Sequence, residues 1–133
     1  MASYGDILTA LDTLFAGLPG VQLVVRHPPT SVQVWPLVWN ERVSWTQELT
    51  GQLVVRRYQF RHHILVPLQD PQAVAAILDP YVDAVLDAFQ AQPTLGGLLQ
   101  RGLARIIGGG PVEYSVGQVL CWSYDFMSEV MIK

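Results

Sequence analysis

The sequence predicts an α+β fold, in which helices pack on one face of a mixed, mainly antiparallel β-sheet. The strongest observation is the segment Leu53–Val66, whose even positions are mostly apolar and whose odd positions are mostly polar. Because side chains alternate between the two faces of a strand, we expect one face of this strand to be buried and the other to be largely wet. At Ile64–Val66 both faces are apolar, so we expect the strand to be covered on both sides there. Two further segments, one at the N-terminus and one after residue 70, carry apolar residues at helical spacing. A one-faced strand and one-striped helices predict helices that lie on a sheet.

Length and composition predict one globular domain, residues 1–133. Hydrophobic residues make up 50% of the chain, whereas charged residues make up only 14%, below the usual ~25%. The weakly charged surface fits either contacts with other subunits or a compact neutral domain, and composition does not separate the two. The net charge of −3 gives no general attraction to phosphate. No apolar run approaches the ~18 residues of a membrane span, and the N-terminus lacks the basic region of a signal peptide.

The first expected helix begins at a capping box formed by Ser3 and Asp6. Gly17 is a natural C-terminal stop, and Pro19-Gly20 predicts a turn. The apolar stripe of this helix consists of Ile7, Leu8, Leu11, Leu14, Phe15 and Leu18.

Three strand candidates precede the long strand. Val21–Arg26 reads as a short strand, Val32–Asn40 as a second and Glu41–Leu49 as a third. Pro36 lies inside the second candidate and indicates an edge position or a bulge, because proline lacks the N–H that a ladder needs. Thr50-Gly51 predicts the turn of a hairpin into the long strand.

The second expected helix covers Pro71–Gln92, with Asp70 as N-cap and Pro71 in the first turn. A second Asp-Pro pair, Asp79-Pro80, interrupts the helical ladder. The helix therefore either kinks there or restarts with Asp79 as a new cap, and we favour the restart. Asp79, Asp83 and Asp87 share one face, which predicts a solvated stripe.

The C-terminal part predicts a final hairpin. Pro93–Gly97 closes the second helix, and Leu98–Ile107 is ambiguous between a short helix and a strand. Gly108–Pro111 is expected to be a loop. We expect its two strands to be Val112–Val116 and Val119–Ile132, joined by a turn at Gly117-Gln118.

The residues that commonly carry catalysis do not form a recognisable constellation. His62 and His63 are adjacent, so on a regular strand they point to opposite faces and do not chelate one metal together. His62 falls on the apolar face, which favours a hydrogen-bonded core histidine over a catalytic one. Cys121 is the lone cysteine, so it forms no intrachain disulfide, and we expect it to be a buried core residue and not a nucleophile. Gly108–Gly110 lacks the Lys-Ser/Thr of a phosphate-binding loop. We therefore expect no catalytic residue, metal or cofactor.

Arginines on the long strand raise the possibility of nucleic-acid binding, because Tyr58 and Phe60 lie between them. The two aromatic residues, however, fall on the face opposite to Arg57 and Arg61. The polar face is better explained by cross-strand pairs of these arginines with Glu41 or Glu48.

Several short segments follow one another in a characteristic order: Leu18–Val21, His27–Val32, Trp35–Val38, Leu78–Tyr81, Pro93–Gly97 and Phe126–Lys133. This order, which covers nearly the whole chain, resembles the small tail terminator (neck, tail-completion) proteins of long-tailed bacteriophages. Thr94–Gly97 is its most specific segment. Leu98–Gly110 is more apolar and richer in glycine than that pattern, which leaves the register of the late strands open.

The resemblance implies a structural protein rather than an enzyme. Such proteins form a ring, usually a hexamer, that caps the tail tube, ends its polymerisation and provides the surface for head attachment. The implied partners are further copies of the chain, the major tail tube protein and a head-completion or connector protein, with DNA passing through the channel without sequence-specific binding. The implied location is the virion tail or neck, after assembly in the host cytoplasm, with no membrane and no cofactor.

Two sets of residues are candidates for surfaces of such a ring. Trp35 and Trp39 lie on or near the strand that Pro36 marks as an edge, so they are expected either at an interface or in the core. Arg57 and Arg61 are expected to be exposed or at an interface. The acidic stripe Asp79, Asp83 and Asp87 is a candidate lining of the channel.

Two alternatives remain beside the tail terminator. One is another ring component of the phage neck or tail, such as a head-closure protein. The other, of a different class, is a small enzyme or nucleic-acid-binding module that uses His62, His63 and the arginines.

Overall fold

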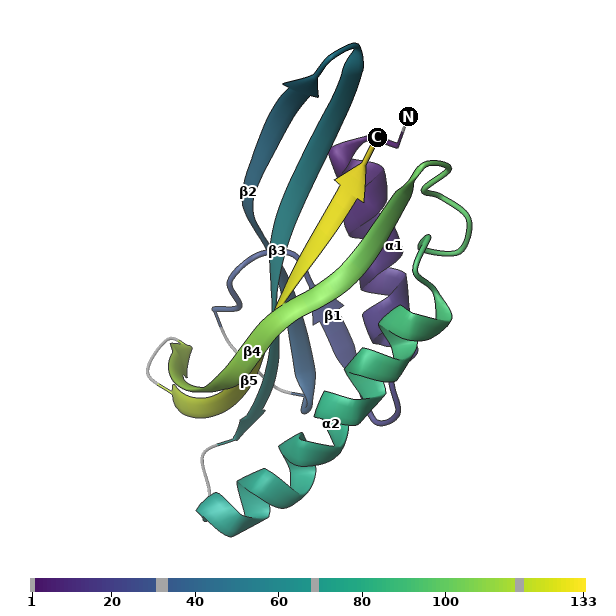
Figure 1. Ribbon diagram of the computed structural model, residues 1–133. Coiled ribbons are helices and arrows are strands. Elements are labelled where there is room, and N and C mark those ends of the chain that lie inside the picture. The colour runs from purple at the N-terminus through teal and green to yellow at the C-terminus, as the bar shows by residue number, and fades with distance from the viewer. Residues whose placement is uncertain (1, 31–33, 68–69, 117–118) are drawn as a thin grey trace.

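The computed structural model describes residues 2–30, 34–67, 70–116 and 119–133, and it confirms the α+β fold (Figure 1). Two helices and five strands follow the order α1 (Tyr4–Ala16), β1 (Leu23–Val25), β2 (Leu37–Thr50), β3 (Leu53–Pro67), α2 (Pro71–Ala91), β4 (Gly102–Val116) and β5 (Val119–Ile132). The strands form one sheet in the order β1-β2-β3-β5-β4. Within the described ranges, the short β1 pairs in parallel with β2, and the other neighbouring strands pair in antiparallel fashion.

Helix α1 begins and ends where the sequence predicts. The Ser3 side chain accepts a hydrogen bond from the Asp6 backbone N–H, and the Asp6 side chain accepts one from the Ser3 backbone N–H. The predicted capping box is therefore present, and Gly17 is the C-cap. The apolar stripe of α1 is buried against the sheet.

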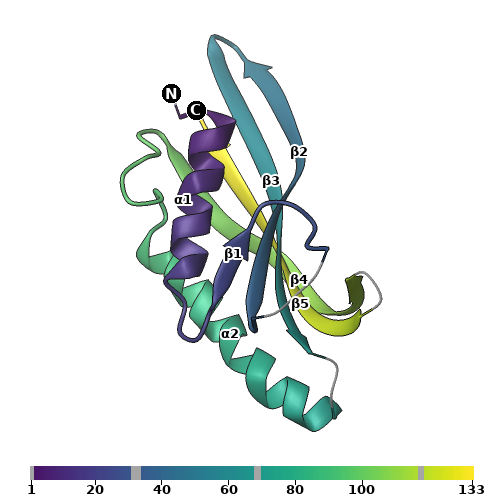
Figure 2. The same ribbon diagram turned by 180° about the vertical axis from the view of Figure 1, so that it is seen from behind.

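Both helices contribute to one core on the same face of the sheet. Phe15 of α1 stacks on the His62 ring of β3 at 4.4 Å between centroids and meets Phe89 of α2 edge-on at 6.1 Å. Phe60, fully buried, belongs to the same core, as its even position in the strand predicts. The two helices therefore form a single layer, as Figures 1 and 2 allow the reader to follow from both sides.

The sheet differs from the prediction at two places. The candidates Val32–Asn40 and Glu41–Leu49 form one strand, β2, which starts at Leu37 after Pro36; residues 31–33 lie outside the described part of the chain. The expected loop Gly108–Pro111 lies inside β4 and pairs with β5. Strand β4 is at the edge of the sheet, where a proline is tolerated because its missing N–H can face away from the neighbouring strand. The segment Leu98–Ile107, which the sequence leaves ambiguous between a helix and a strand, enters strand β4 at Gly102.

Helix α2 is also different from the prediction, because it runs through Asp79-Pro80 without a restart. The apolar stripe continues on both sides of Pro80, with Leu78 before it and Tyr81 after it buried against the sheet. Packing of this stripe therefore outweighs the one helical bond that proline removes. Asp70 stands at the N-cap position as expected, but its side chain makes no capping hydrogen bond.

Candidate functional site

The face of the sheet that the helices leave uncovered carries the predicted ladder of arginines and carboxylates. The Arg61 guanidinium lies 4.0 Å from the Glu41 carboxylate, and that of Arg57 lies 3.9 Å from Glu48. The predicted cross-strand pairs are thus confirmed. Glu129 of β5, almost fully buried, adds a third carboxylate, 3.5 Å from Arg57. Arg57 and Arg61 are both partly exposed, and neither is paired in a way that removes it from the surface.

His63 lies on this same face, but it is fully buried rather than wet as its odd position in the strand predicts. Its Nδ1 is 2.8 Å from the Asp125 carboxylate and its Nε2 is 2.9 Å from Glu41. The ring stacks on Trp39 and meets Tyr114 edge-on. A second, smaller core covers this face, as the apolar run Ile64–Val66 predicts, but it extends one residue further than expected and also encloses His63. Its buried members are Leu37, Trp39, Leu65 and Cys121.

The two tryptophans expected at an interface or in the core belong to this smaller core. Trp39 is 9% exposed, so the core alternative applies to it. Trp35, partly buried, packs against the same cluster. The strand position also differs from the edge that Pro36 suggests, because at Leu37–Trp39 strand β2 lies between β1 and β3. Trp39 is therefore a residue of the subunit interior.

His62 is the hydrogen-bonded core histidine that the sequence predicts. Burial lowers the pKa of His62 to about 3, and His63 adds a smaller lowering. The neutral ring donates from Nδ1 to the Asn40 side-chain oxygen at 2.8 Å and accepts at Nε2 from the Ser128 hydroxyl at 2.6 Å. The Asn40 side-chain N–H donates to Asp12 of α1 at 2.8 Å. This chain of bonds connects α1 with β2, β3 and β5 and satisfies the polar groups that the core buries.

The order serine, histidine, carboxamide has the hydrogen-bonding pattern of a nucleophilic triad, but its surroundings argue for a structural role. Ser128, His62 and Asn40 are all fully buried, so the hydroxyl meets no substrate. At His63 both ring nitrogens face carboxylates, and neither is left to exchange a proton with a substrate. Among the described residues, no group of three or more His, Cys, Asp or Glu side chains could hold a metal ion. Burial also raises the pKa of the Cys121 thiol, which disfavours the reactive thiolate.

The outer half of the β2–β3 hairpin, residues 43–56, is the most exposed apolar element, and we call it the arm. Figures 1 and 2 show it projecting beyond the other strands and α1. Trp45 is 63% exposed and Leu49 is 72% exposed. From Asn40 to Thr50, β2 has no strand partner on the side away from β3 among the described residues. The arm thus presents large apolar side chains next to an open strand edge, which is an arrangement typical of protein–protein contact.

A register shift between Arg42 and Ser44 determines which way the arm residues point. Before the shift, even residues of β2 such as Asn40 face the helices; after it, odd residues such as Trp45 pair with the helix-facing Tyr58. The sequence places Trp45 on a strand but does not distinguish it from the buried Trp39. The signal that could have found it is the polar sequence around it, Ser44, Thr46 and Gln47, which offers no cover from the subunit itself.

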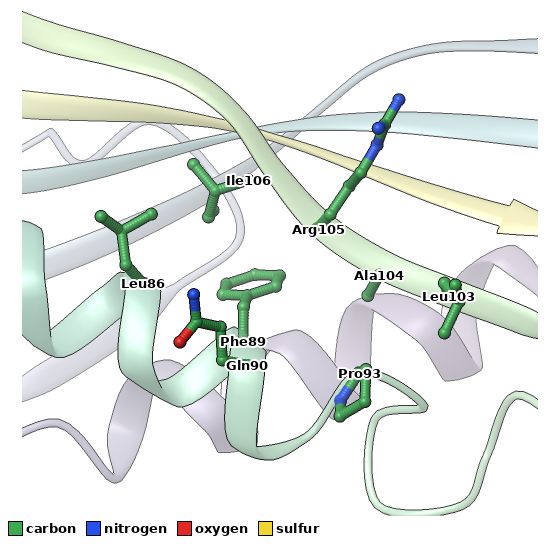
Figure 3. A pocket seen from close by; sticks show the side chains of 8 residues that line it. All are labelled: Leu86, Phe89, Gln90, Pro93, Leu103, Ala104, Arg105 and Ile106. Atoms are coloured by element: carbon green, nitrogen blue, oxygen red, sulfur yellow. The ribbon is translucent and has the colours of Figure 1, made fainter.

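A hollow of about 320 Å³ lies between α2 and β4, at the other edge of the sheet (Figure 3). Leu86 and Phe89 of α2 and Ile106 of β4 give it apolar walls, and Gln90 adds a carboxamide. Arg105 points away from α2, to the other side of the strand (Figure 3). The hollow is a second apolar surface that the isolated subunit leaves open.

The acidic stripe occupies the side of α2 that faces away from the sheet. Asp79, Asp83 and Asp87 are all exposed, as the prediction of a solvated stripe requires. Whether the stripe lines a channel depends on the assembly and stays a prediction.

The comparisons with known proteins add no identification. A scan of protein-family models finds no match to the chain, and a search of curated proteins finds none either. None of the helices in the described ranges is long and apolar enough to cross a membrane.

Proposed function

We propose that the chain is a structural subunit of a homo-oligomeric ring, a hexamer, that caps the tail tube of a long-tailed bacteriophage. The ring ends polymerisation of the tube and provides the surface for head attachment. In this proposal the protein performs no catalysis and needs no cofactor. It acts in the tail or neck of the virion after assembly in the host cytoplasm.

The observation that carries the proposal is the arm. Trp45 and Leu49 expose most of their surface on a projecting hairpin with an open strand edge. Such side chains are costly to leave in water and are enriched in interface hot spots, particularly tryptophan. The resemblance to tail terminators in the order of the short segments supplies the kind of assembly. The buried, mutually satisfied histidine networks favour a structural role over the enzymatic alternative.

Three partners follow from the proposal. Further copies of the chain complete the ring, the major tail tube protein meets one face, and a head-completion or connector protein meets the other. DNA passes through the channel, where the exposed carboxylates of Asp79, Asp83 and Asp87 would repel its phosphates if they line the wall. The partly exposed Arg57 and Arg61 are candidates for contacts at a face of the ring.

The test is the capping of tail tubes. Tubes assembled from the cognate major tail protein are mixed with the purified chain and viewed by electron microscopy. The proposal predicts a ring density at one end only, and tubes that stop growing when more tube protein is added. Tubes that remain bare and continue to grow would contradict it. Binding to a portal-proximal neck complex without any effect on tubes would favour the head-closure alternative.

A further inference from the structure

The arm and the hollow between α2 and β4 have complementary surfaces, and they lie on different parts of the same chain. We propose that the arm of one copy seats Trp45 and Leu49 in the α2–β4 hollow of the next copy. This inference deepens the proposed ring and rests on it, because it names the contact through which successive subunits would join.

The arm places its two large apolar side chains on one side of the strand. Trp45 and Leu49 are four residues apart after the register shift, so both point to the helix side of the sheet. Glu48 lies between them in sequence and points to the opposite side, with 60% of its side chain exposed. On the helix side, Trp45 and Leu49 flank Gln47, which accepts a hydrogen bond from Arg56 at 2.8 Å, whereas the opposite side of the strand carries the Glu48 carboxylate.

The hollow has apolar walls on one side of β4 and a charged side chain on the other. Its walls, on the helix side of β4, are apolar, with Leu86 exposed enough to contact a partner. Gln90 supplies a carboxamide oxygen that could accept the hydrogen bond of a buried indole N–H. On the opposite side of the strand, the Arg105 side chain is 68% exposed.

Charge supports the same pairing. The buried Glu129 carboxylate accepts from Arg105 at 3.3 Å and from Arg57 at 3.5 Å, so one carboxylate serves two guanidinium groups. Arg105 therefore keeps donors for a further acidic partner. Suppose that the sheets of two neighbouring copies lie side by side with their helix-covered faces on the same side. Trp45 and Leu49 of one copy then meet the apolar walls of the hollow in the next copy. Glu48 then comes to the side on which Arg105 is exposed.

A second copy of the chain is the occupant that these observations favour. The hollow lies at the β4 edge of the sheet, whereas the arm belongs to β2 and β3 and projects beyond the ends of the other strands (Figure 1). A contact between two different patches of the same chain is heterologous, so it repeats from copy to copy and closes into a ring when the rotation fits. The Ala104 N–H of β4 already donates to the Pro93 carbonyl at 2.8 Å, so it is not free to pair with a strand of the next copy. The contact therefore consists mainly of seated side chains and not of a continuous strand ladder between copies.

The first experiment measures assembly by native mass and sedimentation of the full chain. Trp45→Ser and Leu86→Arg are compared with wild type and with Leu23→Ser, a matched control on β1 that is 44% exposed and lies outside arm and hollow. We expect the concentration for half-assembly to rise at least about tenfold in the first two variants. The control should assemble as wild type does. Far-UV circular dichroism and thermal melting verify that each variant is folded.

The second experiment traps the contact directly. Leu49→Cys protein is mixed under oxidising conditions with Leu86→Cys protein that carries a mass tag. Native Cys121 is fully buried and does not compete. A mixed disulfide between the two species is expected, whereas Leu23→Cys mixed with Leu86→Cys should give none.

The outcomes separate this inference from the proposed function. A ring that survives Trp45→Ser and yields no Leu49–Leu86 disulfide overturns the contact and leaves the ring intact. A wild-type chain that stays monomeric, alone and with tail tubes, overturns both.

Discussion

His63 stacks on Trp39 on the sheet face that neither helix covers, with ring centroids 4.1 Å apart and 20° between the ring planes. Both residues are buried, together with Leu65 and Cys121. The sequence predicts this face of β3 to be largely wet but covered at Ile64–Val66, and the second core lies there and extends to His63, next to the charged ladder of Arg57 and Arg61.

The first prediction compares the two tryptophans of β2, the buried Trp39 and the exposed Trp45. Trp39→Ala should lower the free energy of unfolding by ~3–5 kcal/mol, because it removes a buried ring and leaves a cavity under His63. Trp45→Ala should change it by about 0.5 kcal/mol or less, because the side chain is mostly in water in the isolated subunit. Urea unfolding of monomeric protein at low concentration measures both, and equal losses would contradict the register of β2.

The neutral, buried His62 predicts a loss of stability in mild acid. The folded pKa is lowered to about 3 while the unfolded value is 6.5, so below pH 6.5 the unfolded chain binds a proton that the folded chain does not. The stability that the neutral ring contributes is therefore complete above pH 6.5 and falls as pH decreases towards 3, by at most ~1.4 kcal/mol per pH unit. Urea unfolding between pH 7.5 and 4 measures the slope. His62→Gln removes the titrating group, so a variant with the wild-type slope would refute this assignment.

Gly109 predicts a steric requirement inside β4. A Cβ at this position would lie 2.6 Å from the Asp125 carbonyl oxygen of β5, whereas a Cβ at Gly108 would meet nothing within 4 Å. Gly109→Ala should therefore destabilise the subunit by ~1–3 kcal/mol, because the two backbones must separate. Gly108→Ala should be neutral or stabilising by about 0.5–1 kcal/mol. If thermal melting ranks the two variants in the reverse order, the pairing of β4 with β5 at the glycines is incorrect.

Pro80 predicts a stabilising substitution. It lies exposed inside a continuous helix, where it has no N–H to donate to the Ala76 carbonyl. Pro80→Ala should raise the free energy of unfolding by ~1–3 kcal/mol. Proline in a helix interior costs about 3 kcal/mol, and its restriction of the unfolded chain offsets somewhat less than about 1 kcal/mol of that cost. Pro71→Ala, at the first turn where proline fits, serves as the control and should be neutral or mildly destabilising. A loss of stability on Pro80→Ala would mean that α2 is broken there.

Much of the fold could be predicted because the decisive signals are local. The Ser3/Asp6 capping box, the stripe of α1 and the alternation in β3 each specify their element from neighbouring residues. The arginine–carboxylate pairs of β3 with β2 also follow from the alternation. The fold class could be derived from these elements together.

What could not be predicted depends on contacts between distant residues. Gly108–Pro111 reads as a loop, but pairing with β5 along its whole length makes it an edge strand. Asp79-Pro80 reads as a restart, but burial of the stripe on both sides keeps α2 continuous. The exposure of Trp45 follows from a register shift and from the projection of the arm, neither of which has a local signature. The Gly117-Gln118 turn lies outside the described residues.

The mass of the assembled protein tests the central claim most directly. Native mass spectrometry of the full chain, alone and after release from tail tubes, should give a closed species of six subunits of 14.8 kDa each, at least in the presence of tubes. A protein that keeps the mass of one subunit at every concentration, and that never co-sediments with tubes, would contradict the ring.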